Sequence, residues 1–377
     1  MREVLDQLAA WQADGVPVGR AVVVRTFGSA PRPEGAVLLA SADGRIAGSV
    51  SGGCVEGAAA GEIEQARETG LARVIRYGIS DEQAWDVGLA CGGTIDVLVE
   101  PTVAAIVADA AQVPLRGAGG RAVVTPLPPD APPSTFGAHE PGEGAPPAPK
   151  LLVGDDGTLS GSLGSPEADA AIVAAARDAL LRGTSRTVTI GAEQLFVEAF
   201  PRQPRLVVVG AVEVARSLVR LARELGYEVI VVDGRPAFAT PERFPPDTVD
   251  RLVVGWPDEV ADEIGLGRAD AVAVLTHDVK FDEPAIVEAI RRGCRYVGAV
   301  GSKKTQADRR ARLREAGLSD EELDRLRGPI GLDLGGRDPA ETALAILAEI
   351  VAERYGGTGV PMRELARRQA EREPVPA

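Results

Sequence analysis

The spacing of apolar residues divides the chain into two parts of different character. Up to about residue 200, short apolar strands are separated by turns, and the dipeptides Asp43-Gly44 and Asp156-Gly157 are typical of β-hairpins. From residue 205 onward, fully apolar runs alternate with helix-like stretches. Because a strand buried on both faces of a parallel sheet is continuously apolar, the second part is predicted to be a doubly wound parallel sheet.

The first part contains an internal repeat. Residues 19–23 (Gly-Arg-Ala-Val-Val) recur unchanged at 120–124, and the segment 38–50 resembles the segment 151–163. Each copy then continues into an alanine-rich helical stretch and closes with a short apolar strand that ends in Glu. Both copies are therefore expected to form a hairpin, a helix and a returning strand.

Two such copies are expected to pack around a pseudo-twofold axis, so that each buries one face of its sheet. We therefore interpret residues 1–201 as one duplicated α+β module, with repeats at about 15–101 and 117–201. The copies differ first in an insert at 126–150, which is rich in Pro, Gly and Ala. This composition predicts a segment that buries too little apolar surface to order itself, with His139 in solvent.

The copies differ a second time at a cysteine. Residues 51–54 read Ser-Gly-Gly-Cys in the first copy, whereas 164–167 read Gly-Ser-Pro-Glu in the second. The fold therefore does not require Cys54. Gly52 and Gly53 let the backbone approach a ligand, and the helix predicted to begin at Val55 favours a thiolate, which suits a soft metal or persulfide sulfur. The structural alternative is a small buried side chain.

A second cysteine has similar surroundings. Cys91 precedes Gly92 and Gly93, just before a predicted strand. Two glycine-flanked cysteines in one module are hard to explain by packing alone. They either face a common pocket, where both ligate a metal, or form a reversible disulfide, and the sequence leaves both open. Cys294, which lies before an apolar strand, is expected to be structural.

Two further residues of the first copy are candidates. Arg32 lies in the loop 28–35 between the first two strands, where its guanidinium can bind a phosphate or a ligand carbonyl, or simply be solvated. Glu56 is a candidate proton acceptor beside Cys54. A glutamate in a first helical turn is also favoured by the helix dipole, so a structural role is equally compatible with the sequence.

The second part, residues 205–355, is predicted to be a Rossmann-like domain. It follows a linker at 201–204 and precedes a flexible tail at 356–377. Strands are expected at 205–210, 228–233, 271–275 and 296–300, and helices at 212–225, 318–327 and 339–355. The whole chain is therefore placed in the α/β class, as a duplicated α+β module followed by a parallel-sheet domain.

The turn after the first of these strands takes the place of a dinucleotide-binding loop. Gly210 is the first glycine of the Gly-x-Gly-x-x-Gly pattern, but Val212 stands where the chain must approach a pyrophosphate, and Glu213 adds negative charge. Asp233, at the end of the next strand, is placed for a ribose contact. The pattern supports the fold more strongly than it supports binding of NAD(P).

Two later turns carry candidate ligand-binding residues at the carboxyl ends of strands. His277 and Asp278 follow one strand, where a histidine can bind a ligand, transfer a proton or be purely structural. Gly301, Ser302 and Lys303 follow the next strand and open a helix. This arrangement suits a phosphate, although a solvated helix start has the same sequence pattern.

Charge and composition exclude other classes of protein. A formal net charge of −14 over 377 residues argues against a nucleic-acid partner. No apolar run approaches the roughly 20 residues of a membrane-spanning helix, and the N-terminus lacks the apolar core of a signal peptide, so the cytoplasm is the expected location. Three cysteines and two histidines fit neither a disulfide framework nor a structural zinc site.

Six motifs together resemble the XdhC/CoxI family. They are Gly-Ser-Ala-Pro-Arg-Pro-Glu-Gly at 28–35, Gly-Ser-Val-Ser-Gly-Gly-Cys-Val-Glu at 48–56, Gly-Leu-Ala-Cys-Gly-Gly at 88–93, Thr-His-Asp at 276–278, Gly-Ser-Lys-Lys at 301–304 and Pro-Ile-Gly-Leu-Asp-Leu-Gly at 329–335. The resemblance covers nearly the whole chain except the insert and the tail. It departs at 210–214, where the family commonly has Gly-Ala-Gly-His-Val and this chain has Gly-Ala-Val-Glu-Val.

This resemblance implies an accessory protein, rather than an enzyme, for molybdenum hydroxylases of the xanthine dehydrogenase or carbon monoxide dehydrogenase type. Such a protein binds molybdenum cofactor, as molybdopterin or its dinucleotide form, supports its sulfuration with a cysteine desulfurase and inserts it into the apoenzyme. Cys54 and Cys91 fall in the family's cysteine motifs, so the resemblance implies that they hold the cofactor. A homodimer is a further expectation.

Two other functions are compatible with the sequence. One is an NAD(P)-dependent oxidoreductase that uses the Rossmann-like domain, against which Val212 and Glu213 argue. The other is a docking protein that has kept the fold and lost cofactor handling, against which the intact cysteine motifs argue.

Overall fold

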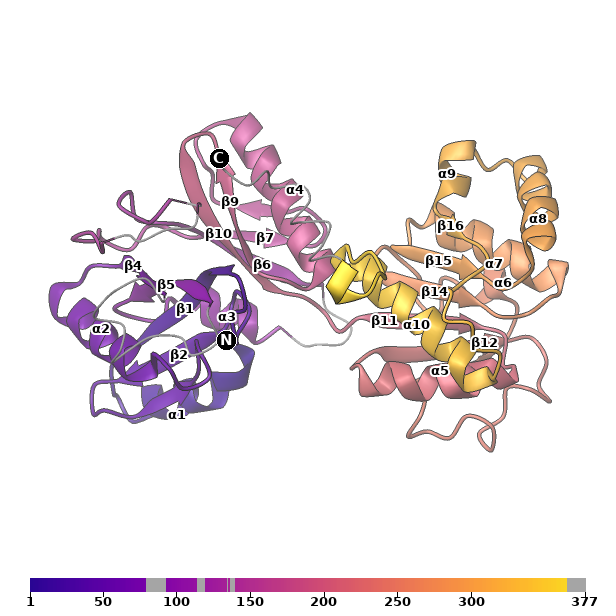
Figure 1. Ribbon diagram of the computed structural model, residues 1–377, viewed down its shortest axis with the longest axis horizontal. Coiled ribbons are helices and arrows are strands. Elements are labelled where there is room, and N and C mark those ends of the chain that lie inside the picture. The colour runs from indigo at the N-terminus through magenta and orange to yellow at the C-terminus, as the bar shows by residue number, and fades with distance from the viewer. Residues whose placement is uncertain (79–92, 114–118, 134, 136–139, 365–377) are drawn as a thin grey trace. The chain divides into compact units, whose positions relative to one another are not determined.

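The computed structural model describes residues 1–78, 93–113, 119–133, 135 and 140–364. The chain forms two compact units, Met1–Arg202 and Gln203–Ala377 (Figure 1). The division falls within the short proline-containing segment between the two sequence patterns.

The first copy of the repeat forms a five-stranded antiparallel sheet covered by one helix. The strands lie in the order β3-β2-β1-β5-β4. Its elements are β1 (Val18–Phe27), β2 (Val37–Ser41), β3 (Ile46–Gly48), α2 (Glu56–Thr69), β4 (Arg73–Tyr77) and β5 (Thr94–Glu100). The 3-10 helix η1 (Arg2–Val4) and helix α1 (Leu5–Ala13) precede it, and helix α3 (Ala105–Ala111) follows.

The second copy repeats this arrangement. Its strands lie in the order β8-β7-β6-β10-β9, which is the order of the first sheet shifted by five. Its elements are β6 (Arg121–Pro126), β7 (Leu151–Gly154), β8 (Leu159–Ser160), α4 (Pro166–Arg182), β9 (Arg186–Ile190) and β10 (Glu193–Phe200). The predicted fold class, a duplicated α+β module ahead of a Rossmann-like sheet, is confirmed. Each copy contains one strand more than expected, because a further short strand, β4 or β9, follows the helix.

Each sheet buries both of its faces. One face packs on the helix of its own copy, so that Val23 and Ile63 share a cluster in the first copy and Val124 and Ile172 share one in the second. The opposite faces share a third cluster that contains residues from both copies, including Val22, Leu98, Val123 and Phe196. Side chains alternate between the two faces of the sheet along β1 and β6. Each of these strands therefore contributes residues to two hydrophobic cores.

A buried cluster of charged side chains also joins the two copies. Arg20 on β1 pairs with Glu100 on β5 and, at 2.9 Å, with Glu198 on β10, and Lys150 lies 2.6 Å from Glu100. Burial alone would raise the pKa of Glu100, but the charges of Arg20 and Lys150 outweigh it and lower the pKa. The carboxylate is therefore ionised, and removal of a partner would leave a buried charge.

The insert corrects one expectation. Its described residues are docked on the module, since Leu127 and Ala131 are buried and Ala145 forms a backbone bridge with Ala72. Arg25 and Arg76 donate hydrogen bonds to the carbonyl oxygen of Pro133. The prediction of a segment unable to order itself was wrong for this part of the insert. The segment buries little apolar surface, but arginine side chains also hold it through hydrogen bonds to its backbone carbonyl oxygens. His139 lies outside the described residues.

The second unit contains a six-stranded parallel sheet in the order β13-β12-β11-β14-β15-β16. Its strands are β11 (Arg205–Val209), β12 (Glu228–Asp233), β13 (Arg251–Val254), β14 (Asp270–Val274), β15 (Tyr296–Ala299) and β16 (Leu326–Arg327). Its helices are α5 (Glu213–Glu224), α6 (Pro257–Val260), α7 (Val279–Arg291), α8 (Lys303–Glu315), α9 (Asp320–Asp324) and α10 (Pro339–Tyr355). The helix predicted at 318–327 is in fact the short α9 followed by β16.

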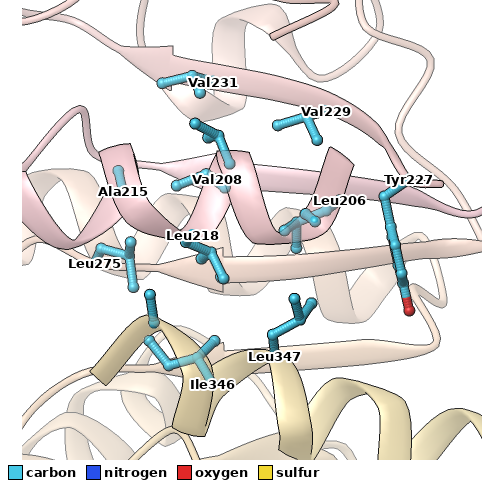
Figure 2. Close-up of a cluster of buried hydrophobic side chains, with 14 of the residues drawn as sticks. Leu206, Val208, Ala215, Leu218, Tyr227, Val229, Val231, Leu275, Ile346 and Leu347 are labelled. Atoms are coloured by element: carbon cyan, nitrogen blue, oxygen red, sulfur yellow. The ribbon is translucent and has the colours of Figure 1, made fainter. Parts of the chain in front are cut away.

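The parallel sheet has an apolar core on each face. On one face, α5 and α10 cover the sheet. Leu218 of α5 and Ile346 of α10 belong to one cluster with Leu206 and Val208 of β11 (Figure 2). On the other face, side chains of α7 and α8 pack on the sheet. The strand order reverses between β11 and β14, and open sheets of this kind bind ligands at such a point, beyond the carboxyl ends of the strands.

Candidate cofactor-binding site

The loop that carries Cys54 is held by a single carboxylate. Glu56, the first residue of α2, accepts hydrogen bonds from the hydroxyl groups of Ser49 and Ser51, each at 2.6 Å, and from the backbone N–H of Gly53 at 2.8 Å. Gly52 and Gly53 have φ angles of 79° and 116°, a backbone region that favours glycine. The two glycines thus turn the chain so that it wraps around the Glu56 carboxylate.

This geometry assigns Glu56 a structural role. Burial alone would raise the pKa of Glu56, but hydrogen bonds from Ser49 and Ser51 outweigh it and lower the pKa to about 2. A carboxylate of such low pKa is a poor proton acceptor for a thiol. The second copy has the same arrangement without a cysteine, since Asp169 accepts hydrogen bonds from Ser162 and from the N–H of Leu163. The acid serves to fix the loop in both copies.

Cys54 itself is exposed, and within the described part of the chain its thiol is free. Its N–H donates to the hydroxyl oxygen of Ser51 at 2.9 Å, which fixes its backbone just before α2. The structural alternative of a small buried side chain is therefore wrong for Cys54. Cys294 is the opposite case, because it is buried and desolvation raises the pKa of its thiol to about 12, as expected of a structural residue.

Three sequence motifs of the first copy meet beside Cys54. A Cβ atom built on Gly52 would lie 3.9 Å from Pro31 in the loop 28–35, so the cysteine loop adjoins that loop. A Cβ atom on Gly93 would lie 2.7 Å from the carbonyl oxygen of Ser29, so only glycine fits there. Gly93 ends the motif that contains Cys91 and Gly92, and both of these residues lie outside the described part of the chain.

Arg32, in the same loop, has a partner within the protein. Its guanidinium lies 2.6 Å from the carboxylate of Glu3, and about a third of the Arg32 side chain is exposed. A ligand phosphate would therefore compete with Glu3 for this arginine. Because exposed ion pairs are weak, replacement of Glu3 by a phosphate at Arg32 would cost little free energy.

In the second unit, Asp233 is turned inward. It is fully buried and accepts hydrogen bonds from the N–H of Ala211 and from the Arg235 guanidinium. Burial alone would raise the pKa of Asp233, but these hydrogen bonds outweigh it and lower the pKa. Gly210 has a φ of 105°, and a Cβ atom there would lie 2.4 Å from Thr276. Asp233 thus fixes the turn after β11, and a ribose would reach Arg235 before it reached this carboxylate.

His277 and Asp278 line an open groove at the carboxyl edge of the sheet. The groove has a volume of about 680 Å³, and Val212, Arg235 and Lys280 also line it. Asp278 begins α7 and accepts a hydrogen bond from the N–H of Lys280 at 3.0 Å. The groove therefore brings together the basic side chains of Arg235, in the turn after β12, and Lys280, at the start of α7.

Gly301, Ser302 and Lys303 form the turn into α8. Ser302 accepts a hydrogen bond from the N–H of Thr305, and Lys303 is exposed. Sequence reasoning missed the buried residues beneath this turn. Arg309 donates to the carbonyl oxygen of Val300 and pairs at 2.8 Å with Asp282. The sequence contains little indication that Arg309 and Asp282 are buried, because single charged residues on a helix are usually exposed to solvent.

Two limits apply to the part of the chain that the structure describes. Within it, no group of three or more His, Cys, Asp or Glu side chains could hold a metal ion. None of the helices described is long and apolar enough to cross a membrane.

Sequence profiles and known proteins agree with this architecture. The profile of the XdhC and CoxI family matches residues 11–78 and 140–191, and that of the XdhC Rossmann domain matches 206–350. A Bacillus subtilis protein, named as a probable subunit of xanthine dehydrogenase, is 27% identical over 361 residues, which are 93% of this chain and 96% of that protein.

Two further proteins show similarity over most of the chain. The Escherichia coli molybdenum cofactor insertion chaperone PaoD is 28% identical over 336 residues, 88% of this chain and 82% of PaoD. A crystal structure described as a xanthine dehydrogenase from Bacillus halodurans has the same fold, with a TM-score of 0.59, 24% identity and coverage of 96% and 99%. With both units matched by family profiles and the cysteine motif in place, the chain belongs to the XdhC/CoxI family.

Proposed function

We propose that the protein is a chaperone that binds molybdenum cofactor and inserts it into a molybdenum hydroxylase of the xanthine dehydrogenase or carbon monoxide dehydrogenase type. The observation that carries this proposal is Cys54, which is exposed on a loop with a fixed backbone. The second copy has the equivalent loop, and Glu167, in the first turn of α4, stands at the position of the cysteine. The thiol is therefore not needed for folding, and a soft metal is its natural ligand.

In this proposal the molybdenum centre is cargo. Cys54 supplies a thiolate ligand in the chain's first unit, and Cys91 supplies a second one from the motif that ends at Gly93. Because Gly93 packs on the loop 28–35 that also adjoins Gly52, both cysteine motifs border the same loop. Arg32, in that loop, is placed to bind an anionic part of the cofactor once Glu3 releases it.

The names of the relatives support the same role. PaoD is named a molybdenum cofactor insertion chaperone, and its similarity extends over both units of this chain. The proposed partners are an apo molybdenum hydroxylase and a cysteine desulfurase that supplies sulfur to the bound cofactor, and the chaperone is proposed to act as a homodimer. In the second unit, taken by itself, the groove lined by Arg235, His277 and Lys280 is proposed to bind a phosphate-bearing ligand. NAD(P) is the alternative ligand there.

The proposal is tested by anaerobic mixing of the purified protein with molybdenum cofactor, followed by gel filtration and metal analysis. The wild-type chain is expected to co-elute with about one molybdenum per binding site, and Cys54→Ala with Cys91→Ala is expected to lose the metal. Glu167→Ala is the matched control, because it alters the equivalent position of the second copy. Undiminished co-elution with the double variant would refute the proposal.

A further inference from the structure

The turn after β11, where a parallel sheet of this order commonly binds a dinucleotide, is occupied by the protein's own groups. Such ligands place their pyrophosphate against backbone N–H groups at the start of the following helix, which requires a close approach of the chain. Here the N–H of Gly210 donates to the carbonyl oxygen of Val232, and the N–H of Ala211 donates to the carboxylate of Asp233, each at 2.8 Å. Val212 lines the groove at this place. Both the donors and the space of a pyrophosphate site are therefore reduced.

The start of α5 also has an unfavourable charge for a pyrophosphate. Glu213 is the first residue of this helix, and no side chain caps it. Glu213 pairs with Arg216 on the same helix, but 61% of the Glu213 side chain is exposed. A pyrophosphate placed there would lie beside a carboxylate of the same charge.

Asp233 is not available to the ribose of a dinucleotide. Its side chain is fully buried, and both of its oxygens accept hydrogen bonds. One oxygen accepts from the backbone N–H and the Nε of Arg235, and the other accepts from the N–H of Ala211 and the Nη2 of Arg235. A ribose hydroxyl would have to displace these bonds. The second contact typical of a bound dinucleotide is therefore lacking as well.

Arg235 instead presents a fixed cation to the groove. Two of its nitrogens bind Asp233, and its guanidinium lies 4.0 Å from the centre of the Phe238 ring. No described residue accepts a hydrogen bond from its third nitrogen, Nη1, and 46% of the side chain is exposed. Because the guanidinium is already held in place, it loses little conformational entropy when it binds an anion.

The rest of the groove combines a second cation with apolar walls. Lys280 is exposed, and within the described part of the chain its ammonium forms no ion pair. Asp278 is the acidic residue of the lining, and its carboxylate caps α7 by accepting the N–H of Lys280. His277 adds a further polar group, and Leu275 and Val279 add apolar surface. The groove therefore suits a ligand with a compact double negative charge and a small apolar body.

The charge on each phosphorus distinguishes two classes of phosphate ligand. A terminal phosphate monoester has a charge of about −1.5 to −2 at neutral pH and three oxygens that accept hydrogen bonds. Each phosphorus of an internal pyrophosphate has a single negative charge and fewer terminal oxygens. The paired cations Arg235 and Lys280 therefore match the monoester better than the pyrophosphate.

We propose that this groove binds the terminal phosphate monoester of a small molecule through Arg235 and Lys280, and that it rejects dinucleotides that bind through a pyrophosphate, such as NAD+. The inference rests on the proposed function in one respect, the phosphate-bearing ligand of this groove. It does not depend on the thiol of Cys54. Loss of metal capture and loss of monoester binding are therefore separate outcomes.

The test uses a monoester with an apolar body and a matched diester. Phenyl phosphate is titrated into the full chain by calorimetry and compared with methyl phenyl phosphate, which has a single negative charge, and with NAD+. Phenyl phosphate should bind about tenfold more tightly than either. NADP+ has a monoester on its ribose, and it should bind no more tightly than 2′-AMP because its pyrophosphate gains no contact.

Variants locate the site. Lys280→Gln should weaken the binding of phenyl phosphate about tenfold, and Arg235→Lys, which keeps the charge but loses the planar fork, should weaken it by a similar factor. Arg220→Gln is the matched control, because it removes one exposed cation of the same unit outside the groove. This control and Cys54→Ala should both bind as the wild type does. Unchanged melting temperatures show that the variants are folded.

Three results would overturn the proposal. The first is the absence of phenyl phosphate binding. The second is equal or tighter binding of the diester or of NAD+, or tighter binding of NADP+ than of 2′-AMP; this result refutes the monoester but keeps a phosphate-bearing ligand. The third is binding that is unchanged in both Lys280→Gln and Arg235→Lys, or that Arg220→Gln weakens to the same extent.

Discussion

The two copies of the N-terminal module have the same fold but different chemistry. Both have the same strand order, and in both an acid in the first turn of the helix holds the preceding loop. Cys54 of the first copy corresponds to Glu167 of the second. Features shared by both copies are explained by folding. A residue present in only one copy is a candidate for function, and Cys54 is such a residue.

The two copies also differ in how the N-termini of α2 and α4 are capped. In the second copy, Ser165 caps α4 with its side chain and Pro166 occupies the first turn, a favourable combination. In the first copy the residue before α2 is Val55, which provides no side-chain cap, and two left-handed glycines precede Cys54. A missing cap costs roughly 1 kcal/mol. The first copy thus presents its thiol beside a helix that lacks the side-chain cap of the second copy.

Exchange of the two residues between the copies should have the largest effect. In the double variant Cys54→Glu with Glu167→Cys, the thiol moves to the first turn of α4, in a copy that lacks the motifs at 28–35 and 88–93. Molybdenum retained after anaerobic gel filtration is expected to fall to background, while Glu167→Ala alone retains the metal. Full retention by the exchanged chain would show that any exposed thiol on this fold is sufficient.

The next largest effect is expected at the charge cluster that joins the copies. Arg20→Met would leave Glu100 and Glu198 buried without their shared partner. The free energy of unfolding should fall by about 3–5 kcal/mol, as measured by urea denaturation. A change below about 1 kcal/mol would mean that the two copies are not joined through Arg20.

A smaller and matched pair of effects is expected from the two acids that hold the loops. Glu56→Gln and Asp169→Asn should each reduce the free energy of unfolding by about 1–3 kcal/mol, because each removes a charge-assisted set of hydrogen bonds. Only Glu56→Gln should also weaken molybdenum capture, since only its loop carries a thiol. Equal loss of capture in both variants would contradict the assignment of the site to the first copy.

Glu56 also predicts a pH dependence. Its pKa falls from an ordinary value of 4.5 to about 2 in the folded chain. Its contribution to stability is therefore fully present above about pH 4.5 and is lost as the pH falls toward 2. Denaturation midpoints measured across this window should decline less steeply for Glu56→Gln than for the wild type. Parallel curves would exclude Glu56 as a contributor.

The smallest effect is expected at Arg32. Its ion pair with Glu3 is partly exposed, so Arg32→Ala should change the free energy of unfolding by no more than about 1 kcal/mol. If the proposed function is correct, the same variant weakens cofactor binding without loss of folding. A variant that unfolds would instead make Arg32 a structural residue.

The sequence allowed prediction of the fold more fully than of the site. The internal repeat and the apolar runs predicted the duplicated module and the parallel sheet, because strands and turns leave local patterns. Strands β4, β9 and β13 were missed, and so was β16, which is only two residues long. The order of the insert was missed because it depends on Arg25 and Arg76, which are distant in sequence from the prolines they bind.

The site was predictable only as residue types and motifs. The repeat comparison identified Cys54, and its exposure agrees with that choice. The sequence did not reveal that Asp233 is buried against Ala211 and Arg235, nor that Glu56 holds a loop, because both depend on side-chain direction. The convergence of Gly52 and Gly93 on the loop 28–35 likewise required coordinates.

In the proposed function, the thiol of Cys54 ligates the molybdenum of the bound cofactor. X-ray absorption at the molybdenum K-edge of the loaded protein measures this directly, with Cys54→Ser compared with Glu167→Ala. Sulfur scattering is expected to decrease in Cys54→Ser, as an oxygen ligand or water replaces the thiolate, and to be unchanged in Glu167→Ala. The same number of sulfur ligands in Cys54→Ser as in the wild type would contradict it.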